Sequence, residues 1–296
     1  MTVSVIIPVL NAAHTITHLL DALQTQSCIP DEIIIADSSS DDGTAELCAA
    51  CPGVSVISIR RRDFNHASTR DIAIRAAKGD ICILMTQDAV PVDDHLIENL
   101  ISPLDAPSVC MAYGRQLPKA DASLPEKLIR EYNYPAESFL RSSEDIPIYG
   151  LKTFFFSDVC AAYRKADYLL LGGFEPSLPA NEDMLFAAKA IRAGYKTAYV
   201  SNACVYHSHD FSFRSQYRRY KSQAAALEMH RDLLEGTGYS GEGIKLFRHV
   251  SSALLKQGKL AAWGSFCADC SARALGHLAG KRAAWYSGNK KGKFSV

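Results

Sequence analysis

The alternation of short apolar runs with helical segments over the first 90 residues most narrowly limits the fold of this chain. Four runs rich in apolar and β-branched residues are predicted to be buried strands, at residues 3–9, 31–37, 54–60 and 80–86. Segments of helical character separate them, at residues 12–27, 44–51 and 68–79. Strands that alternate with helices in this way predict a parallel sheet with helices on both faces.

Acidic residues follow two of these strands. Asp37 ends the run "IIIAD", and Asp88 lies in "ILMTQDAVP". Because ligands bind beyond the carboxyl ends of the strands in such sheets, we expect both carboxylates to face one crevice. Many metal-binding strand ends carry two acids, whereas here Thr86 stands where the partner of Asp88 would be. The stretch alone therefore leaves two interpretations open, a metal site that lacks one ligand and a plain strand end.

The rest of the chain continues the mixture of strands and helices. Further strands are predicted in "VCMAYGRQ" and "KTAYVSNACVYHSH", and a long helix over residues 213–235. Residues 117–150 are rich in Pro, Asp and Ser, which predicts that they include a mobile loop. We therefore divide the chain into an α/β domain, residues 1–235, and a helical, basic appendage, residues 236–296.

The composition is that of a globular protein with unevenly distributed charge. The 296 residues are 48% hydrophobic, enough for a large core, and their net charge of zero argues against general nucleic-acid binding. Residues 240–296 hold ten Lys and Arg against two Asp and Glu, which leaves 22 basic and 30 acidic residues elsewhere. Such a basic tail suggests an acidic partner. The segment also carries the aromatic residues Trp263, Phe266, Trp285 and Tyr286, which together with the basic charge fit a helix that contacts an anionic membrane surface. A protein or dimer interface is the alternative.

The sequence predicts a cytoplasmic protein. The start, "MTVSVIIPVL", has neither the basic stretch nor the cleavage site of a secretory signal, and no apolar run approaches the roughly 20 residues of a membrane span. The nine cysteines are then expected to be reduced thiols. Two pairs have metal-type spacing, Cys48/Cys51 and Cys267/Cys270, but neither has a nearby pair that would complete four ligands. Buried helix cysteines are the favoured interpretation.

Five stretches in order carry a resemblance to a known family. They are "VSVIIPVLN", "IIIADSSSDDGT", "FNHASTRDIAIRAAKGD", "LMTQDAVP" and "GGFEPSLPANEDMLFAAKAIRAGYKTAYVSNACVYHSH". Over residues 3–225 the chain resembles the nucleotide-sugar-dependent glycosyltransferases of family 2, and most closely their bacterial rhamnosyltransferase-like branch. The resemblance implies an α/β GT-A fold, with a mostly parallel Rossmann-like sheet and flanking helices, over the first 235 residues.

The same resemblance implies a reaction. A sugar, L-rhamnose or another hexose, would pass with inversion from a nucleotide-diphosphate donor to a glycan or lipid-linked acceptor in bacterial cell-surface polysaccharide synthesis. The cofactor implied is a divalent cation, Mn²⁺ or Mg²⁺. Residues implied to bind the donor are Pro8, Asn11, Asp37, His66, Arg70, Gln87 and Asp88.

Physical alternatives stand beside two of these donor contacts. A carboxylate at the position of Asp37 can accept hydrogen bonds from the base or ribose of a nucleoside, or it can cap the next helix. Arg70 and His66 would lie near the diphosphate, which a guanidinium binds by forked hydrogen bonds. Arg70 could equally be a solvated helix residue.

The catalytic residues implied by the resemblance are Asp183, as the base that deprotonates the acceptor hydroxyl, and Glu182 as its companion. Their position in the first turn of a predicted helix also fits a favourable interaction with the helix dipole. Gly173 and Phe174 would form part of the acceptor or sugar pocket, with Phe174 stacked on a sugar, although "GGF" could be only a turn.

The metal ligands implied are Asp88 and His207, with His209 in reserve. Strand alternation places both imidazoles on one face, where neutral rings can bind Mn²⁺ or Mg²⁺ beside a carboxylate. A phosphate contact or a structural role is the alternative. With one carboxylate, metal binding without the donor should be weak, so we expect metal and nucleotide to bind together.

Two other classes of protein are alternatives to a glycosyltransferase. A nucleotidyltransferase should carry a Gly-rich phosphate loop with a Lys near its start, and "PVLNAAHT" has none. A catalytically silent nucleotide-sugar-binding protein would have no need of Glu182 with Asp183 or of the paired histidines.

Overall fold

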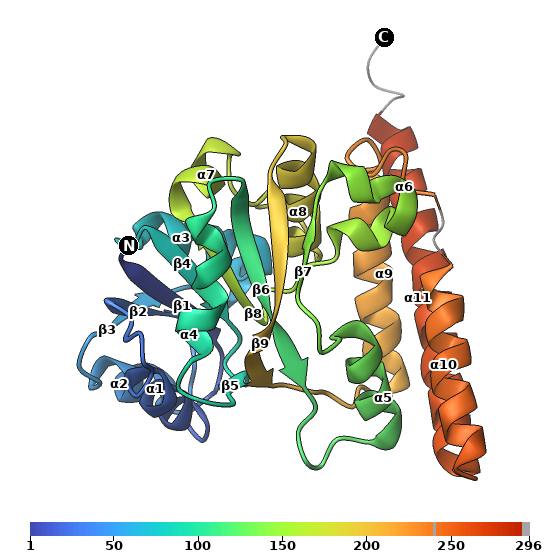
Figure 1. Cartoon of the computed structure of the whole chain (residues 1–296), viewed down its shortest axis with the longest axis horizontal. Coiled ribbons are helices and arrows are strands. Elements are labelled where there is room, and N and C mark those ends of the chain that lie inside the picture. Colours follow the sequence, from blue (N-terminus) through green and yellow to red (C-terminus); the bar gives the residue numbers. More distant parts are fainter. Residues whose placement is uncertain (239–240, 292–296) are drawn as a thin grey trace.

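A single sheet forms the centre of the computed structural model, which describes residues 1–238 and 241–291 (Figure 1). The strands run in the order β3-β2-β1-β4-β8-β6-β9-β5, and β7 pairs with β9. Their bounds are β1 Val3–Val9, β2 Glu32–Asp37, β3 Val54–Ser58, β4 Ile81–Met85, β5 Val90–Pro91, β6 Val109–Leu117, β7 Phe139–Arg141, β8 Cys160–Arg164 and β9 Lys196–Tyr206.

The first four strands are parallel, as the sequence predicts, and the remainder of the sheet is mixed. β1 pairs in parallel with β2 and β4, and β2 with β3. β8 is antiparallel to both of its neighbours, β4 and β6, while β6 and β9 are parallel. Because the direction reverses twice across β8, the carboxyl ends of β6 and β9 lie at the same edge of the sheet as those of β1, β2 and β4. We call this edge the strand-end edge.

Helices cover both faces of the sheet, because alternate side chains of its strands point to opposite sides. One core contains Val3, Val5, Ile7 and Val9 of β1 and the apolar residues of α1 (Ile16–Gln24), α2 (Thr44–Ala49) and α4 (Leu96–Ile101). The other contains Ile6 and the apolar residues of α3 (His66–Ala76), α7 (Lys165–Leu170) and α8 (Glu182–Arg192). The predicted α/β class, with helices on both faces, is confirmed.

The segment 117–150 is more regular than the predicted loop. It contains α5 (Leu124–Asn133), β7 and α6 (Ile146–Tyr149). Ser123 caps α5, since its hydroxyl accepts a hydrogen bond from the Glu126 N–H. Short 3₁₀ turns complete the described elements, at Arg61–Asp63, Ser102–Asp105, Ser143–Asp145 and Gly150–Phe154.

Three helices make up the C-terminal part: α9 (Phe213–Met229), α10 (Glu242–Lys256) and α11 (Leu260–Lys291). Figure 1 shows α11 alongside α9. Gly276 and Gly280 of α11 lie so close to α9 that an added Cβ would overlap the carbonyl oxygens of Tyr217 and Lys221. The appendage therefore packs directly on a helix that precedes residue 235, and the boundary placed there remains a prediction.

A third, smaller core joins α5 to the last two helices. Ile129 of α5 packs with Val250 and Leu254 of α10 and with Phe266 of α11. Phe266 is only 1% exposed, so the prediction that it contacts a membrane is wrong. Trp263 is also partly buried and donates to the Ser251 hydroxyl at 3.2 Å.

The remaining two aromatic residues of the basic tail lie near its end. Trp285 is exposed, whereas the Tyr286 side chain falls outside the described part of the chain. Among the described helices, none combines the length and apolarity that crossing a membrane requires.

Candidate active site

The strand-end edge gathers most of the predicted functional residues. Asp37 ends β2, Asn11 follows β1 and Asp88 follows β4. His207 comes directly after β9, and Asp158 precedes the antiparallel β8. The strand order β2-β1-β4-β8-β6-β9 therefore arranges them along a single side of the sheet, as expected for a ligand site of an α/β protein.

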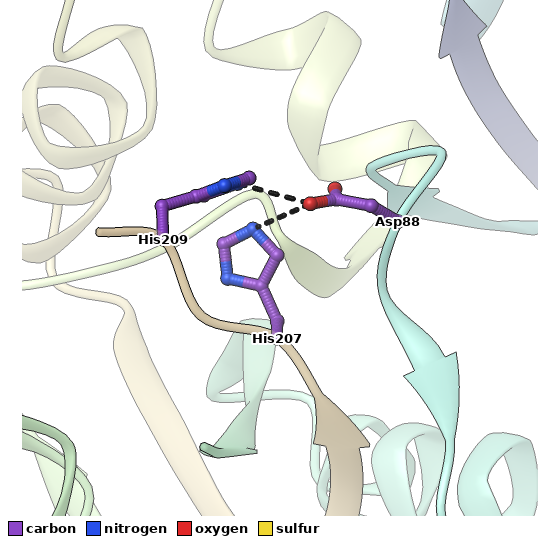
Figure 2. A group of neighbouring side chains, drawn as sticks. All are labelled: Asp88, His207 and His209. Carbon is purple, nitrogen blue, oxygen red and sulfur yellow. Dashed lines mark ion pairs between the residues drawn. The ribbon is translucent and has the colours of Figure 1, made fainter. Parts of the chain in front are cut away.

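Asp88, His207 and His209 form a group suited to a metal ion. One ligand atom of each lies within 4.8 Å of the others. His209 Nε2 is 2.9 Å and His207 Nε2 is 3.6 Å from Asp88 Oδ2. Figure 2 shows both imidazoles reaching from the end of β9 toward the carboxylate beyond β4. The structure therefore brings together the three residues of the predicted Asp/His set. One carboxylate and two imidazoles fit a divalent cation of the first transition row.

The electrostatics of this group favour ligation. His207 is 6% exposed, and burial, with the positive charge of Arg130 nearby, lowers its pKa to about 3, so the ring is neutral. Burial alone would raise the pKa of Asp88, but the hydrogen bond from His209 brings that pKa well below its usual range. The site thus offers an ionised carboxylate and a neutral buried imidazole, the protonation states that metal ligands require.

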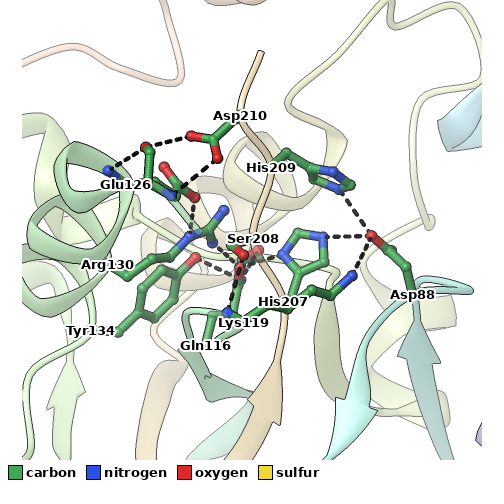
Figure 3. Close-up of polar contacts among 12 residues, drawn as sticks. Asp88, Gln116, Lys119, Glu126, Arg130, Tyr134, His207, Ser208, His209 and Asp210 are labelled. Carbon is green, nitrogen blue, oxygen red and sulfur yellow. Dashed lines mark hydrogen bonds and ion pairs between the residues drawn. The ribbon is translucent and has the colours of Figure 1, made fainter. Parts of the chain in front are cut away.

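Residues of β6 and α5 surround the group and were missed by the sequence reasoning (Figure 3). Lys119 Nζ is 3.9 Å from Asp88 Oδ2. Gln116, at the end of β6, lies 2.9 Å from the His207 ring, and Arg130 of α5 donates to the same amide oxygen. The strand-end rule, applied to "VCMAYGRQ" as it was to the strands before Asp37 and Asp88, would have found Gln116.

A second cluster surrounds Arg70, which is 6% exposed. Its guanidinium pairs with the buried carboxylate of Glu182 and lies 3.7 Å from that of Asp158. These interior carboxylates take the contacts predicted for a donor diphosphate, so the position of Arg70 disagrees with that role. Glu182, the predicted companion of the base, is buried in this ion pair with Arg70.

The carboxylate of Asp183, the predicted base, is held by two backbone N–H groups. Its side chain is partly exposed and accepts hydrogen bonds from the Met184 N–H at 2.7 Å and the Asp158 N–H at 3.2 Å. Burial, and then the charge of Glu182, raise its pKa to about 6. A carboxylate with a raised pKa takes a proton more readily than an ordinary Asp near neutral pH.

The carboxylate of Asp37 is buried and incompletely satisfied. Oδ2 accepts from the Ser40 N–H at 3.1 Å, while Oδ1 has no partner among the described residues. A buried carboxylate oxygen without a donor costs free energy, which a ligand N–H or O–H would recover. Nearby, Asn11 adopts a positive φ of 51° and accepts from the Asp41 N–H.

The other predicted donor contacts differ in how open they are. His66 is exposed at the start of α3, against the Phe64 ring. Pro8 lies within β1 opposite Ala36. The Gln87 amide bonds both the N–H and the C=O of Leu10, at 2.8 and 3.2 Å. Gln87 therefore joins the ends of β1 and β4, and its contact with the donor remains a prediction.

Gly173 and Phe174 line a small pocket, but Phe174 does not have the exposure that the predicted stacking on a sugar requires. Phe174 is 3% exposed and packs edge-on against Tyr163, Tyr168 and Phe186, so it cannot stack on a sugar. Gly173 has a φ of +72°, and an added Cβ would overlap the Asp71 carboxylate. The glycine therefore permits a close approach within the protein, and the turn interpretation is the right one.

The cysteines give no competing metal site. All nine are free, and burial raises the pKa of Cys48 to about 11, as expected for inert thiols. In the described part of the chain, the group at Asp88 is the only cluster with metal-binding geometry.

Comparisons with known proteins agree with this geometry. The family "Glycosyl transferase family 2" matches residues 4–169. The O-antigen chain rhamnosyltransferase RfbN of Salmonella typhimurium is 37% identical over 261 residues, 86% of this chain and 82% of the relative. The O-antigen chain rhamnosyltransferase WbaN of Salmonella anatum is 36% identical over 240 residues, 79% and 75% of the two chains.

Solved structures share the fold. A mannosyltransferase of Pyrobaculum calidifontis, in complex with GDP-Man and Mn²⁺, superposes with a TM-score of 0.63 at 19% identity, over 93% of this chain and 86% of the other. S. aureus TarS 1–349 in complex with UDP gives 0.56 at 16% identity, over 96% and 92%. The predicted GT-A fold, enzyme class and rhamnosyltransferase-like resemblance are confirmed: the chain belongs to glycosyl transferase family 2.

Proposed function

We propose that this glycosyltransferase moves L-rhamnose, or a related hexose, from a nucleotide-diphosphate donor to a growing glycan or its lipid-linked form, with inversion at the anomeric carbon. The names of its relatives support a role in bacterial O-antigen synthesis. The observation that carries the proposal is the convergence of Asp88, His207 and His209 on the edge that also holds Asp37.

Asp37 and Lys119 would bind the donor. The unpartnered Oδ1 of Asp37 accepts a hydrogen bond from the nucleoside, and the Lys119 ammonium adds positive charge beside Asp88, where the diphosphate would lie. Asp88 and His207, with His209 as a third ligand, would hold Mn²⁺ or Mg²⁺. When bound, such a cation neutralises the charge of the departing diphosphate.

Asp183 accepts the proton of the acceptor hydroxyl as that oxygen attacks the anomeric carbon. The N–H groups of Asp158 and Met184 fix the orientation of the carboxylate, and its raised pKa makes it an effective base near neutral pH. Glu182 supports the base electrostatically, because its charge is one cause of that raised pKa.

Release of nucleoside diphosphate tests the proposal. The protein would be incubated with dTDP-, UDP- and GDP-sugars, with Mn²⁺ or Mg²⁺ or with EDTA. We expect release from one donor class that requires the metal, and loss of that release in Asp88→Asn but not in the matched surface variant Asp105→Asn. Absence of metal-dependent release from every donor would favour a silent binding protein, and retention of the anomeric configuration in the product would refute inversion.

Contact with a membrane surface is a separate part of the proposal. Because Phe266 is buried and Trp263 is partly buried, neither supports a membrane contact. The support for the contact is the basic charge of residues 240–296 and the exposed Trp285. Sedimentation with anionic vesicles should decrease in Trp285→Ala. Equal binding to anionic and neutral vesicles would contradict an electrostatic contact.

A further inference from the structure

We propose that Gln116, oriented by Arg130, is a positioning residue that keeps His207 in the tautomer protonated on Nδ1, so that Nε2 is the atom offered to a cation. The inference rests on the proposed metal-dependent function and adds to it a mechanism by which one ligand is prepared. It also gives His207 and His209 different roles in the same site.

The imidazole of His207 is in hydrogen-bond contact with the side-chain amide of Gln116. His207 Nδ1 lies 2.9 Å from Gln116 Oε1, and both side chains are buried, with Gln116 only 2% exposed. A ring nitrogen at this distance either donates to the amide oxygen or accepts from the amide nitrogen. The direction of the hydrogen bond therefore depends on which end of the Gln116 amide faces the ring.

The other partners of the amide decide its orientation (Figure 3). The end that faces His207 also receives an N–H of Arg130, and a guanidinium can only donate. The opposite end lies 2.6 Å from the Tyr134 hydroxyl and 2.9 Å from that of Ser157, both of which can accept. A flipped amide would set its NH₂ group against the guanidinium, so the oxygen faces Arg130 and His207.

The tautomer follows from this orientation. Because Oε1 is an acceptor, the hydrogen of the neutral imidazole lies on Nδ1, and Nε2 carries a lone pair. That lone pair faces Asp88 Oδ2 at 3.6 Å. Two acceptors cannot hydrogen-bond to each other, whereas a cation between them would be attracted to both. Second-shell hydrogen bonds of this kind fix the tautomer of metal-binding histidines in general.

Arg130 is itself held in place, which makes the orientation of Gln116 durable. Its Nε donates to the buried Glu126 at 2.7 Å, one turn earlier on α5. His209 differs, since its side chain is 42% exposed and its Nε2 pairs with Asp88, which is itself a proposed metal ligand. His207 is therefore the preorganised ligand, and His209 is the adaptable one.

The tautomer can be observed directly by long-range ¹H–¹⁵N correlation spectra of protein labelled on histidine nitrogens, with His207→Gln to assign the signals. Gln116→Met removes the acceptor at similar volume, and Gln116→Glu restores an acceptor oxygen. Tyr134→Phe is the matched control, because it removes a partner from the nitrogen end of the same amide. Thermal melting checks that each variant is folded, and loss of the free-ion EPR signal of Mn²⁺, without and with dTDP, UDP or GDP, measures metal affinity.

We expect Nδ1–H for His207 in the wild-type protein, in Gln116→Glu and in Tyr134→Phe, and a mixture of tautomers in Gln116→Met. Mn²⁺ affinity should fall roughly 10- to 100-fold in Gln116→Met and recover in Gln116→Glu. An Nε2–H tautomer in the wild-type protein, or an unchanged tautomer and affinity in Gln116→Met, overturns the inference. If the wild-type protein binds no Mn²⁺ even in the presence of dTDP, UDP or GDP, the proposed metal site fails, while the tautomer spectra still decide the role of Gln116.

Discussion

The raised pKa of Asp183 predicts a specific pH dependence of transfer. A carboxylate acts as a base only when ionised, and its pKa is about 6, against about 3.8 for an ordinary Asp. At pH 5 roughly one-tenth of the Asp183 side chains would be ionised, whereas an unperturbed Asp would be almost fully ionised. The value of kcat/KM should therefore fall about tenfold per pH unit below pH 6.

The same shift makes Asp183 a cost to stability. Because the folded state raises this pKa, the folded protein binds the proton more tightly than the unfolded chain does. Stability associated with the group is present below about pH 4 and is lost as the pH rises to about 6. A gap of about two pKa units corresponds to a loss on the order of 2 to 3 kcal/mol above pH 6.

Asp183→Asn separates the two effects. The variant should lose transfer by roughly 10²- to 10⁴-fold. It should also melt several degrees above the wild-type protein at pH 8, with a smaller difference at pH 5. Glu182→Gln should move the acidic limb of the kcat/KM profile to lower pH, since the charge of Glu182 contributes to the raised pKa.

Initial rates of nucleoside diphosphate release between pH 4.5 and 8, with donor affinity measured at each pH, would test this reasoning. A limb that reports a pKa near that of free Asp, or transfer within tenfold of wild type in Asp183→Asn, would refute the assignment of the base.

Three further predictions concern the donor site and the packing. Asp37→Asn places an amide NH₂ group where the unpartnered oxygen lies, so it should weaken binding of dTDP, UDP or GDP, measured by calorimetry, by roughly tenfold or more. Unchanged affinity would exclude the nucleoside contact. Phe174→Ala should cost about 3 to 5 kcal/mol in denaturant unfolding, and a changed donor KM with unchanged stability would restore the sugar-stacking role. Gly280→Ala should lower the melting temperature by overlap with α9, at a cost of roughly 1 to 3 kcal/mol. Gly264→Ala on the same helix meets no atom within 4 Å and is its control; equal effects would contradict the close packing.

Local patterns were enough to predict the sheet and part of the site. The strand-end rule located Asp37 and Asp88, because the carboxyl end of a strand can be identified from a few neighbouring residues. The spacing of His207 and His209 placed two imidazoles on one side of a strand tip, and β9 brings that tip to Asp88 although 119 residues separate His207 from it.

The prediction for Arg70 was wrong because its partners are distant in sequence. Arg70 has the spacing of a solvated helix residue or a diphosphate ligand, but its partners Asp158 and Glu182 lie about 90 and 110 positions later. Phe174 is a different case, because the rings that bury it belong to the nearby Tyr163, Tyr168 and Phe186. The two glycines before it indicate a turn, but not that the turn folds Phe174 back onto these rings.

α5 is a different case, because its start could have been recognised. Ser123 and Glu126 have capping-box spacing, with Pro125 in the first turn. The Pro, Asp and Ser content of residues 117–150 predicts that they include a loop, but only this capping signal indicates the helix that carries part of the site.

Two adjacent residues of α5 connect parts of the protein that could otherwise diverge separately. Ile129 packs into the core formed with α10 and α11, and Arg130 orients Gln116 beside His207. A chimera that takes residues 242–291 from a relative would alter the packing beneath α5 and thereby affect His207, a proposed metal ligand, which those residues do not contact. Productive exchanges of the C-terminal helices among these transferases should therefore include α5, which makes the smallest transferable unit a discontinuous one.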